Sequence, residues 1–265
     1  MKVSSVSAGA VTALHNLARK FDLAGRINRA IAPDGDLQVR DELTPGESLV
    51  AAMIARACAP LGKRGFAAWA KTTYLPELMN FAAADLTSQH FNALSNLAPW
   101  DQMNVLPQDK LAAIEQELVR EAVLAEQLEL KALAYDTTNF YTHIASTNLR
   151  PKLPQRGHNK QRRSDLRQNA LSTLAPLGLA LAVDQNTQLP LAHVLYEGAR
   201  SDMKTFAEFL KPVRKRLREL TGQPEQLTIV FDAGASSRQN LEDNALSTGL
   251  SSPVKLFVFN IDFLC

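Results

Sequence analysis

The hydrophobic pattern of the chain changes its period near Leu130, and this change limits the possible folds more than any other feature. Before it, apolar residues recur at helical spacing; after it, they alternate with a period of two, as β-strands require. We therefore expect a helical domain over residues 1–128 and a mixed sheet with packed helices over residues 129–265. This combination is typical of the α+β and α/β classes.

Helix signals dominate the first half. Thr44-Pro-Gly-Glu47 combines a capping threonine, an early proline and a glutamate three residues later, which predicts a helix from there to about Ala59. The loop of residues 32–36 should separate it from an earlier helical stretch. The clearest helix is expected over Gln108–Leu130. Its apolar stripe is Leu111, Ile114, Leu118, Val123, Leu124 and Leu128.

The second half predicts the order strand, β-hairpin, helix, strand, helix, strand. Pro190 cannot donate to a sheet ladder, so its strand should lie at an edge or begin at that point. The polar loop of residues 184–187 fits a hairpin turn. The expected strands are 131–142, 177–183, 189–196, 227–231 and 254–259, with helices over 202–220 and 236–246.

Two of these strands carry an aspartate where a strand would not normally hold one. Asp136 lies inside the first strand, and Asp232 directly follows the strand of residues 227–231. If the two strands are neighbours, both carboxylates can share a divalent ion such as Mg²⁺. The alternative is that Asp136 caps a turn and Asp232 caps the following helix. The pattern alone leaves both open.

A strongly basic segment lies between the two aspartates. Residues 150–167 contain seven Lys or Arg residues, opposed only by Asp165. Residues 129–265 hold 17 basic against 13 acidic residues, so the basic excess is local to this half. Such a segment can hold a nucleic-acid backbone, although a solvated loop explains it equally well. A weaker basic face follows on the helix 202–220, where an exposed helix surface is the simpler interpretation.

Several other classes of function have no support. Cys58 and Cys265 form no CxxC pair, so neither a zinc cluster nor a disulfide framework is indicated, and a reducing cytoplasm is expected. His143, His158 and His193 are scattered without metal-ligand spacing. No nucleotide-binding glycine motif or serine-hydrolase motif occurs. A secretory signal and a membrane span are not expected, because no apolar run is long enough.

Five motifs, in their order along the chain, resemble those of the DDE transposases of bacterial insertion sequences. Within these, the resemblance is to the IS4-like family of the IS1634 type, and it covers about residues 130–240. The motifs are Tyr135-Asp-Thr-Thr-Asn-Phe-Tyr141, Arg156-Gly-His-Asn-Lys-Gln-Arg-Arg-Ser-Asp-Leu-Arg-Gln168, Leu189-Pro-Leu-Ala-His-Val-Leu-Tyr-Glu-Gly198, Ser201-Asp-Met-Lys-Thr-Phe206 and Val230-Phe-Asp-Ala-Gly-Ala-Ser-Ser237. The stretch Trp69-Ala-Lys-Thr-Thr-Tyr-Leu-Pro-Glu-Leu78 resembles the same family's N-terminal region.

The resemblance implies an RNase H-like catalytic core that cleaves DNA at transposon ends and transfers the 3′-hydroxyl to target DNA. Asp136 and Asp232 would be its first two acidic ligands, holding Mg²⁺ or Mn²⁺. The N-terminal helices would bind transposon ends or mediate assembly of a homo-oligomeric transpososome. The expected DNA-binding residues are Arg156, His158, Lys160, Arg162, Arg163 and Arg167.

The sequence also departs from that family. Its third ligand is a glutamate on a helix well beyond the second aspartate, whereas Glu242 and Asp243 come too early. The chain is therefore expected to be truncated at its C-terminus and to lack the third acidic ligand. Two alternatives remain: a catalytically inactive remnant that binds DNA or inhibits a transposase, and an unrelated RNase H-like nuclease.

Overall fold

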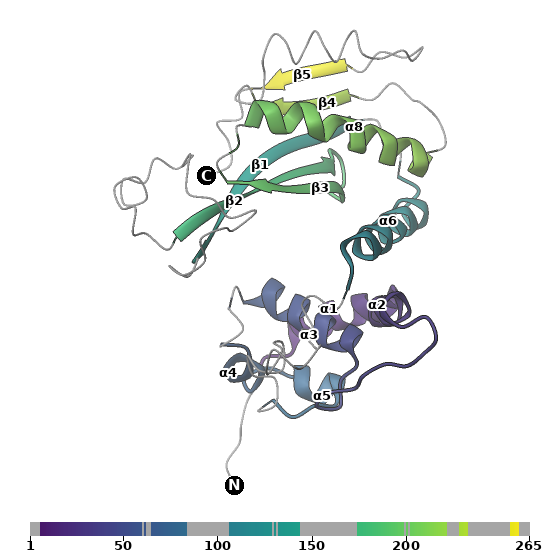
Figure 1. Cartoon of the computed structure of the whole chain (residues 1–265), viewed down its shortest axis with the longest axis vertical. Helices are drawn as coiled ribbons and strands as arrows, with labels where there is room; N and C mark the ends of the chain where they lie inside the picture. The colour runs from purple at the N-terminus through teal and green to yellow at the C-terminus, as the bar shows by residue number, and fades with distance from the viewer. Residues whose placement is uncertain are drawn as a thin grey trace. The chain divides into compact units, whose positions relative to one another are not determined.

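The computed structural model describes residues 6–59, 61, 65–83, 106–128, 130, 132–143, 174–198, 200, 202–221, 228–232 and 255–259. The chain divides into two compact units, Met1–Leu118 and Val119–Cys265, whose elements are labelled in Figure 1. Within the described ranges, no helix is long and apolar enough to cross a membrane.

The first unit is built from helices around one main apolar core. Its elements are α1 (Gly9–Lys20), α2 (Leu23–Ile31), α3 (Pro45–Cys58), α4 (Phe66–Ala70), α5 (Leu75–Met79) and the first part of α6 (Gln108–Ala125). The buried side chains of the main core are Val11, Leu43, Val50, Ala51, Ile54, Ala55, Phe66, Ala70, Leu75 and Phe81.

The predicted start of α3 is confirmed in detail. The Thr44 side chain accepts the Glu47 N–H, and the Glu47 carboxylate accepts the Thr44 N–H at 2.9 Å, so both halves of the capping box are present. Asn28 of α2 adds two bonds: it donates to Thr44 Oγ1 at 3.0 Å and accepts the Gly46 N–H at 2.8 Å. The first turn of α3 is thereby joined to α2.

Three helices are followed within two residues by a left-handed residue that is not glycine. Asp22 (φ 48°) follows the end of α1, Asn80 (φ 56°) follows α5, and Gln127 (φ 49°) follows α6. After α6, the Leu128 N–H donates to the Val123 carbonyl at 3.0 Å, as in a Schellman motif. The expectation that this helix continues to residue 130 was therefore wrong.

The apolar stripe of α6 serves two different cores. Ile114 packs in a small cluster of the first unit, whereas Val119 and Val123 belong to the core of the second unit. Leu111 and Leu124, which were expected on the buried stripe, are exposed at 45% and 62%. Because the helix divides its contacts at Leu118, no single stripe runs along its whole length.

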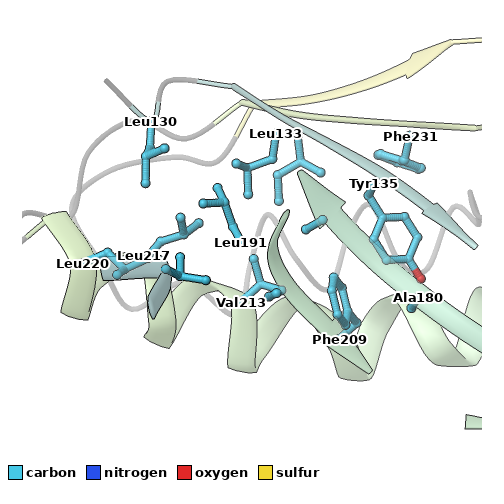
Figure 2. Close-up of a cluster of buried hydrophobic side chains, with 14 of the residues drawn as sticks. Leu130, Leu133, Tyr135, Ala180, Leu191, Phe209, Val213, Leu217, Leu220 and Phe231 are labelled. Carbon is cyan, nitrogen blue, oxygen red and sulfur yellow. The ribbon is translucent and has the colours of Figure 1, made fainter. Parts of the chain in front are cut away.

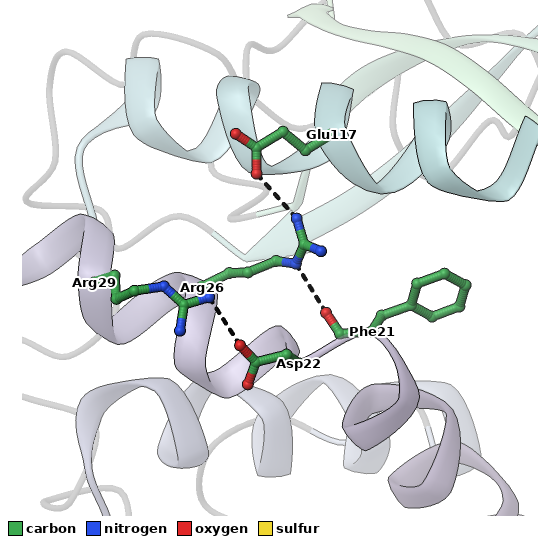
Figure 3. Close-up of polar contacts among 5 residues, drawn as sticks. All are labelled: Phe21, Asp22, Arg26, Arg29 and Glu117. Carbon is green, nitrogen blue, oxygen red and sulfur yellow. Dashed lines mark hydrogen bonds and ion pairs between the residues drawn. The ribbon is translucent and has the colours of Figure 1, made fainter. Parts of the chain in front are cut away.

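An arginine connects α2 to the first part of α6. The Arg26 guanidinium donates from Nε to the Phe21 carbonyl at 2.8 Å and from Nη1 to Glu117 at 3.0 Å (Figure 3). The Arg26 side chain is only 17% exposed. It therefore satisfies a carbonyl near the end of α1 and positions a carboxylate of α6 at the same time. Arg29 makes a separate, exposed ion pair with Asp22.

The second unit contains a five-stranded mixed sheet in the order β3-β2-β1-β4-β5. Strands β1, β2 and β3 are antiparallel, whereas β4 runs parallel to β1 and β5 runs parallel to β4. The fold is α+β, as expected, and its strand order and strand directions are those of an RNase H-like sheet. The bounds are β1 Ala132–His143, β2 Leu174–Asp184, β3 Pro190–Glu197, β4 Thr228–Asp232 and β5 Lys255–Phe259.

The turn between β2 and β3 is fixed by a buried aspartate. Asp184 is 2% exposed, and its Oδ2 accepts both the Thr187 N–H and the Thr187 hydroxyl at 2.8 Å. This local bonding is the reason that a carboxylate can close a hairpin. Strand β3, which begins at Pro190, lies at the edge of the sheet, so that prediction is confirmed.

Helix α8 (Asp202–Thr221) packs on one face of the sheet through aromatic side chains. The Tyr135 ring lies 4.9 Å from Phe206 and 5.0 Å from Phe209, and Phe206 lies 4.4 Å from Phe231, as measured between ring centroids. Figure 2 shows this core between the strands and the helix. The odd-numbered residues of β1 thus face α8, and the even-numbered ones face the opposite side.

Candidate functional site

Asp136 occupies the face of β1 that is turned away from α8. Its neighbour Tyr135 is 3% exposed and anchored in the aromatic core, whereas Asp136 itself is exposed. The alternation of a strand forces this difference, since consecutive side chains point to opposite faces. A strand with one carboxylate can therefore form without burying a charge, which removes the apparent conflict in its sequence.

Asp232 is the last residue of β4, which is the parallel neighbour of β1 (Figure 1). Tyr135 pairs with Phe231, so the register brings Asp136 and Asp232 to the next level along the two strands. Neighbouring strands are about 4.8 Å apart. The two aspartates thus occupy adjacent positions of the sheet, although they are far apart in the sequence.

The Asp136 carboxylate has a local partner in its own strand. Its Oδ1 accepts the N–H of Thr137 at 2.6 Å. Asp136 therefore does not cap a turn: it lies in the middle of β1, paired with Leu181 of β2. The turn-capping interpretation of Asp136 was therefore wrong, whereas the helix expected after Asp232 lies outside the described residues.

Asp136 and Asp232 are both aspartates, so the metal ligands that they can offer are carboxylate oxygens. Such ligands bind Mg²⁺ and Mn²⁺ in preference to softer metal ions. The described part of the chain holds no cluster of three or more His, Cys, Asp or Glu side chains. The positions of Asp136 and Asp232 are thus compatible with a metal held by two protein ligands together with water or phosphate oxygens.

The expected DNA-binding residues, from Arg156 to Arg167, lie outside the described residues. So do Glu242 and Asp243. On the basic face predicted for α8, the described side chains are those of Lys215, which is exposed and lies 3.9 Å from Glu219, and Arg216, which is half-buried. An ion-paired surface lysine fits the simpler interpretation of this face, an exposed helix surface.

The first unit contains a cavity of about 380 Å³ that the sequence did not suggest. Its lining includes His15, Arg19, Asp22, Glu47 and Asn80. Burial and the nearby Arg19 charge lower the pKa of His15 below its ordinary value of 6.5. Side chains of both signs line the cavity, so its charge selects no class of ligand.

His193 belongs to the same face, although no sequence motif singles it out. In the sequence it is one of several scattered histidines, whereas the register places it on the face of Asp136. Only the pairing of three strands reveals this position, so no local pattern could have identified it.

No family model and no curated protein matches the chain. Similar solved structures include the Mos1 transposase paired-end complex with the left transposon end, at 9% identity and TM-score 0.30, covering 83% of this chain and 61% of that one. The piggyBac transposase synaptic complex with hairpin DNA matches at 11% identity and TM-score 0.41, covering 94% and 50%. The chain thus spans about three-fifths and one-half of those chains. Since both TM-scores are below 0.5, the proposals below rest on the residues and strand register of this chain.

Proposed function

We propose that the chain forms the catalytic part of a DNA transposase of the kind encoded by bacterial insertion sequences of the IS4-like family. The observation that carries this proposal is the register of β1 and β4, which puts Asp136 and Asp232 at one level of adjacent strands. The five ordered sequence motifs support it, because two of them contain these aspartates.

In this proposal Asp136 and Asp232 hold Mg²⁺ or Mn²⁺. Such an ion, when bound, activates a hydroxyl nucleophile and stabilises the leaving oxygen of a phosphodiester. The task of the chain is to fix the carboxylates. Tyr135 and Phe231, the residues that precede them, are 3% and 0% exposed and belong to the aromatic core. A site on strands anchored in this way is held more accurately than a site on a loop.

DNA is the proposed partner, both as transposon ends and as target. Arg156, Lys160, Arg162, Arg163 and Arg167, together with His158, would neutralise backbone phosphates close to the cleavage site. The helical domain of residues 1–128 would bind transposon ends or mediate assembly of a homo-oligomer. Binding that depends on these charges should weaken steeply with salt, and replacing Arg162 and Arg163 by alanine should reduce the salt slope.

The test of the metal site is the thermal stability of the purified chain with and without Mn²⁺. An ion that binds only the folded state stabilises it by about 2.7 kcal/mol at a concentration about 100-fold above Kd. Asp136→Asn and Asp232→Asn should each abolish most of this gain. The matched control is Asp34→Asn, which changes an exposed carboxylate in the first unit and should keep the full gain.

A nuclease assay connects the metal to function. Because the chain is expected to lack the third acidic ligand, we expect only weak Mn²⁺-dependent nicking of supercoiled plasmid by the unaltered chain, and its complete loss in Asp136→Asn. If Asp136→Asn keeps the full Mn²⁺ stabilisation, the proposed ligand role is wrong. A chain that binds DNA but gains no stability from Mn²⁺ and cleaves nothing would instead act as a binding or transposase-inhibiting protein.

A further inference from the structure

His193 lies level with Asp136 on the same sheet. Asp136 of β1 pairs with Leu181 of β2, and Leu181 pairs with His193 of β3. Residues paired across strands project to the same face. Asp136, Leu181 and His193 therefore form one row, with a single leucine between the carboxylate and the imidazole.

The burial pattern of β3 agrees with this placement. Ala192 and Tyr196 are 7% and 3% exposed, whereas His193 is exposed and Leu195 is 45% exposed. Two strand spacings separate His193 from Asp136, which is about 10 Å between their backbones. One strand of duplex DNA advances about 3.4 Å per nucleotide along the helix axis, so a strand that follows this row covers the spacing in at most about three nucleotides.

His193 is also distinctive in its charge. Among the described side chains on this face of β1, β2 and β3, it is the only one that can become positive. The others are Ala132, Ala134, Asp136, Thr138, Phe140, Leu177, Leu179, Leu181, Val183, Pro190, Leu195 and Glu197. Among the described residues, His193 is therefore the one basic group that a phosphate backbone can meet on this face of β1, β2 and β3.

We propose that His193 contacts a phosphate of the DNA strand held at Asp136, a few nucleotides from the reacting phosphodiester. The inference rests on the proposed metal site, because that site fixes where the reacting phosphodiester of the DNA strand lies. Protonated imidazole donates a charge-assisted hydrogen bond to phosphate. Its role is to bind and align the strand, not to take part in bond cleavage.

The experiment measures binding of a short fluorescein-labelled duplex by anisotropy, in Mn²⁺, at about pH 6, where an ordinary histidine is mostly protonated. His193→Gln should weaken binding about two- to fivefold, as loss of one exposed charge contact predicts. It should also reduce the magnitude of the salt slope by about 0.9, the value for one phosphate. His193→Arg should retain both the affinity and the slope.

One control locates the effect. Leu195→Ala alters the same face of the same strand and should leave affinity and slope unchanged. Far-ultraviolet circular dichroism checks that every variant is folded.

The outcomes separate the two proposals. If Asp136→Asn removes the Mn²⁺-dependent part of binding while His193→Gln changes neither affinity nor slope, the metal site stands and the role of His193 is overturned. If His193→Gln weakens binding while Asp136→Asn does not, the phosphate contact stands and the metal site fails.

Discussion

At the scale of single residues, the closest approach between α2 and α3 depends on a glycine. Gly46 lies in the first turn of α3 and donates its N–H to Asn28. A Cβ atom at this position would meet the backbone carbonyl oxygen of Ala24 and the Asn28 side chain. Since a backbone oxygen cannot rotate away, the two helices would have to separate.

Gly46→Ala should therefore lower the free energy of unfolding by about 1–3 kcal/mol, the usual cost of overpacking. Gly9→Ala is the matched control, because a Cβ at Gly9 meets nothing within 4 Å. That change should be neutral or stabilise the protein by up to about 1 kcal/mol. Urea denaturation of both variants measures the difference, and equal stabilities would contradict this account of the contact.

His15 makes the stability of the first unit depend on pH. Burial, followed by the Arg19 charge, lowers its pKa in the folded protein below 6.5. The unfolded chain therefore binds the proton more tightly, and stability falls as the pH drops below 6.5, until the folded histidine is protonated as well.

We expect His15→Gln to remove this part of the pH dependence. The melting temperature of the unaltered protein should fall more between about pH 8 and about pH 5 than that of the variant. The remaining fall, caused by carboxylates, is common to both proteins. If the melting temperatures of the two proteins fall by the same amount across this range, His15 contributes nothing to the pH dependence.

At the scale of elements, α8 is held to the sheet by a continuous aromatic contact. Phe206 is fully buried and contacts both Tyr135 of β1 and Phe231 of β4. These two residues precede Asp136 and Asp232. The same contact that stabilises the unit therefore also fixes the backbone of the strands at both aspartates.

Phe206→Ala should cost about 3–5 kcal/mol of stability, and Phe206→Leu should cost much less because most of the volume is kept. Phe140→Ala is the control: Phe140 lies on the other face of β1, is 48% exposed, and should lose little. Chemical denaturation gives the three values. A small loss for Phe206→Ala would mean that the core closes around the missing ring.

Elements with strong local signals were predictable from the sequence. Thr44 and Glu47 marked the start of α3, and Pro190 marked an edge strand, because each signal depends on bonds within a few residues. The ends of α1 and α6 were not predictable. They depend on the left-handed conformations of Asp22 and Gln127. Neither position has the glycine, or a following proline, that would have predicted a helix end.

At the scale of the whole molecule, the two units have separate apolar cores. Substitutions in different cores should therefore act independently. We expect Gly46→Ala to increase proteolytic cleavage within residues 6–59 and Phe206→Ala to increase it within residues 174–221. Mass spectrometry of the early fragments tests this, and the same fragments from both variants would show that the two units unfold as one.

The two aspartates could be identified from the sequence, but their arrangement in the sheet could not be predicted from it. Asp136 and Asp232 stood out because each follows apolar residues that favour a strand, and the family resemblance predicts that they are metal ligands. Their adjacency depends on the parallel pairing of β1 with β4, and the row containing His193 depends on two further registers. Long-range pairing of this kind leaves no trace in local periodicity.

The pairing of β1 with β4 also determines when the site can exist. Tyr135 and Phe231 lie opposite each other but are separated by 96 positions, which span β2, β3 and α8. Distant contacts form slowly because a long loop must close first, whereas the short β2–β3 turn closes locally. A chain still emerging from the ribosome therefore carries Asp136 long before Asp232 joins it. The two aspartates can therefore become neighbours only after β4 has been synthesised and has paired with β1.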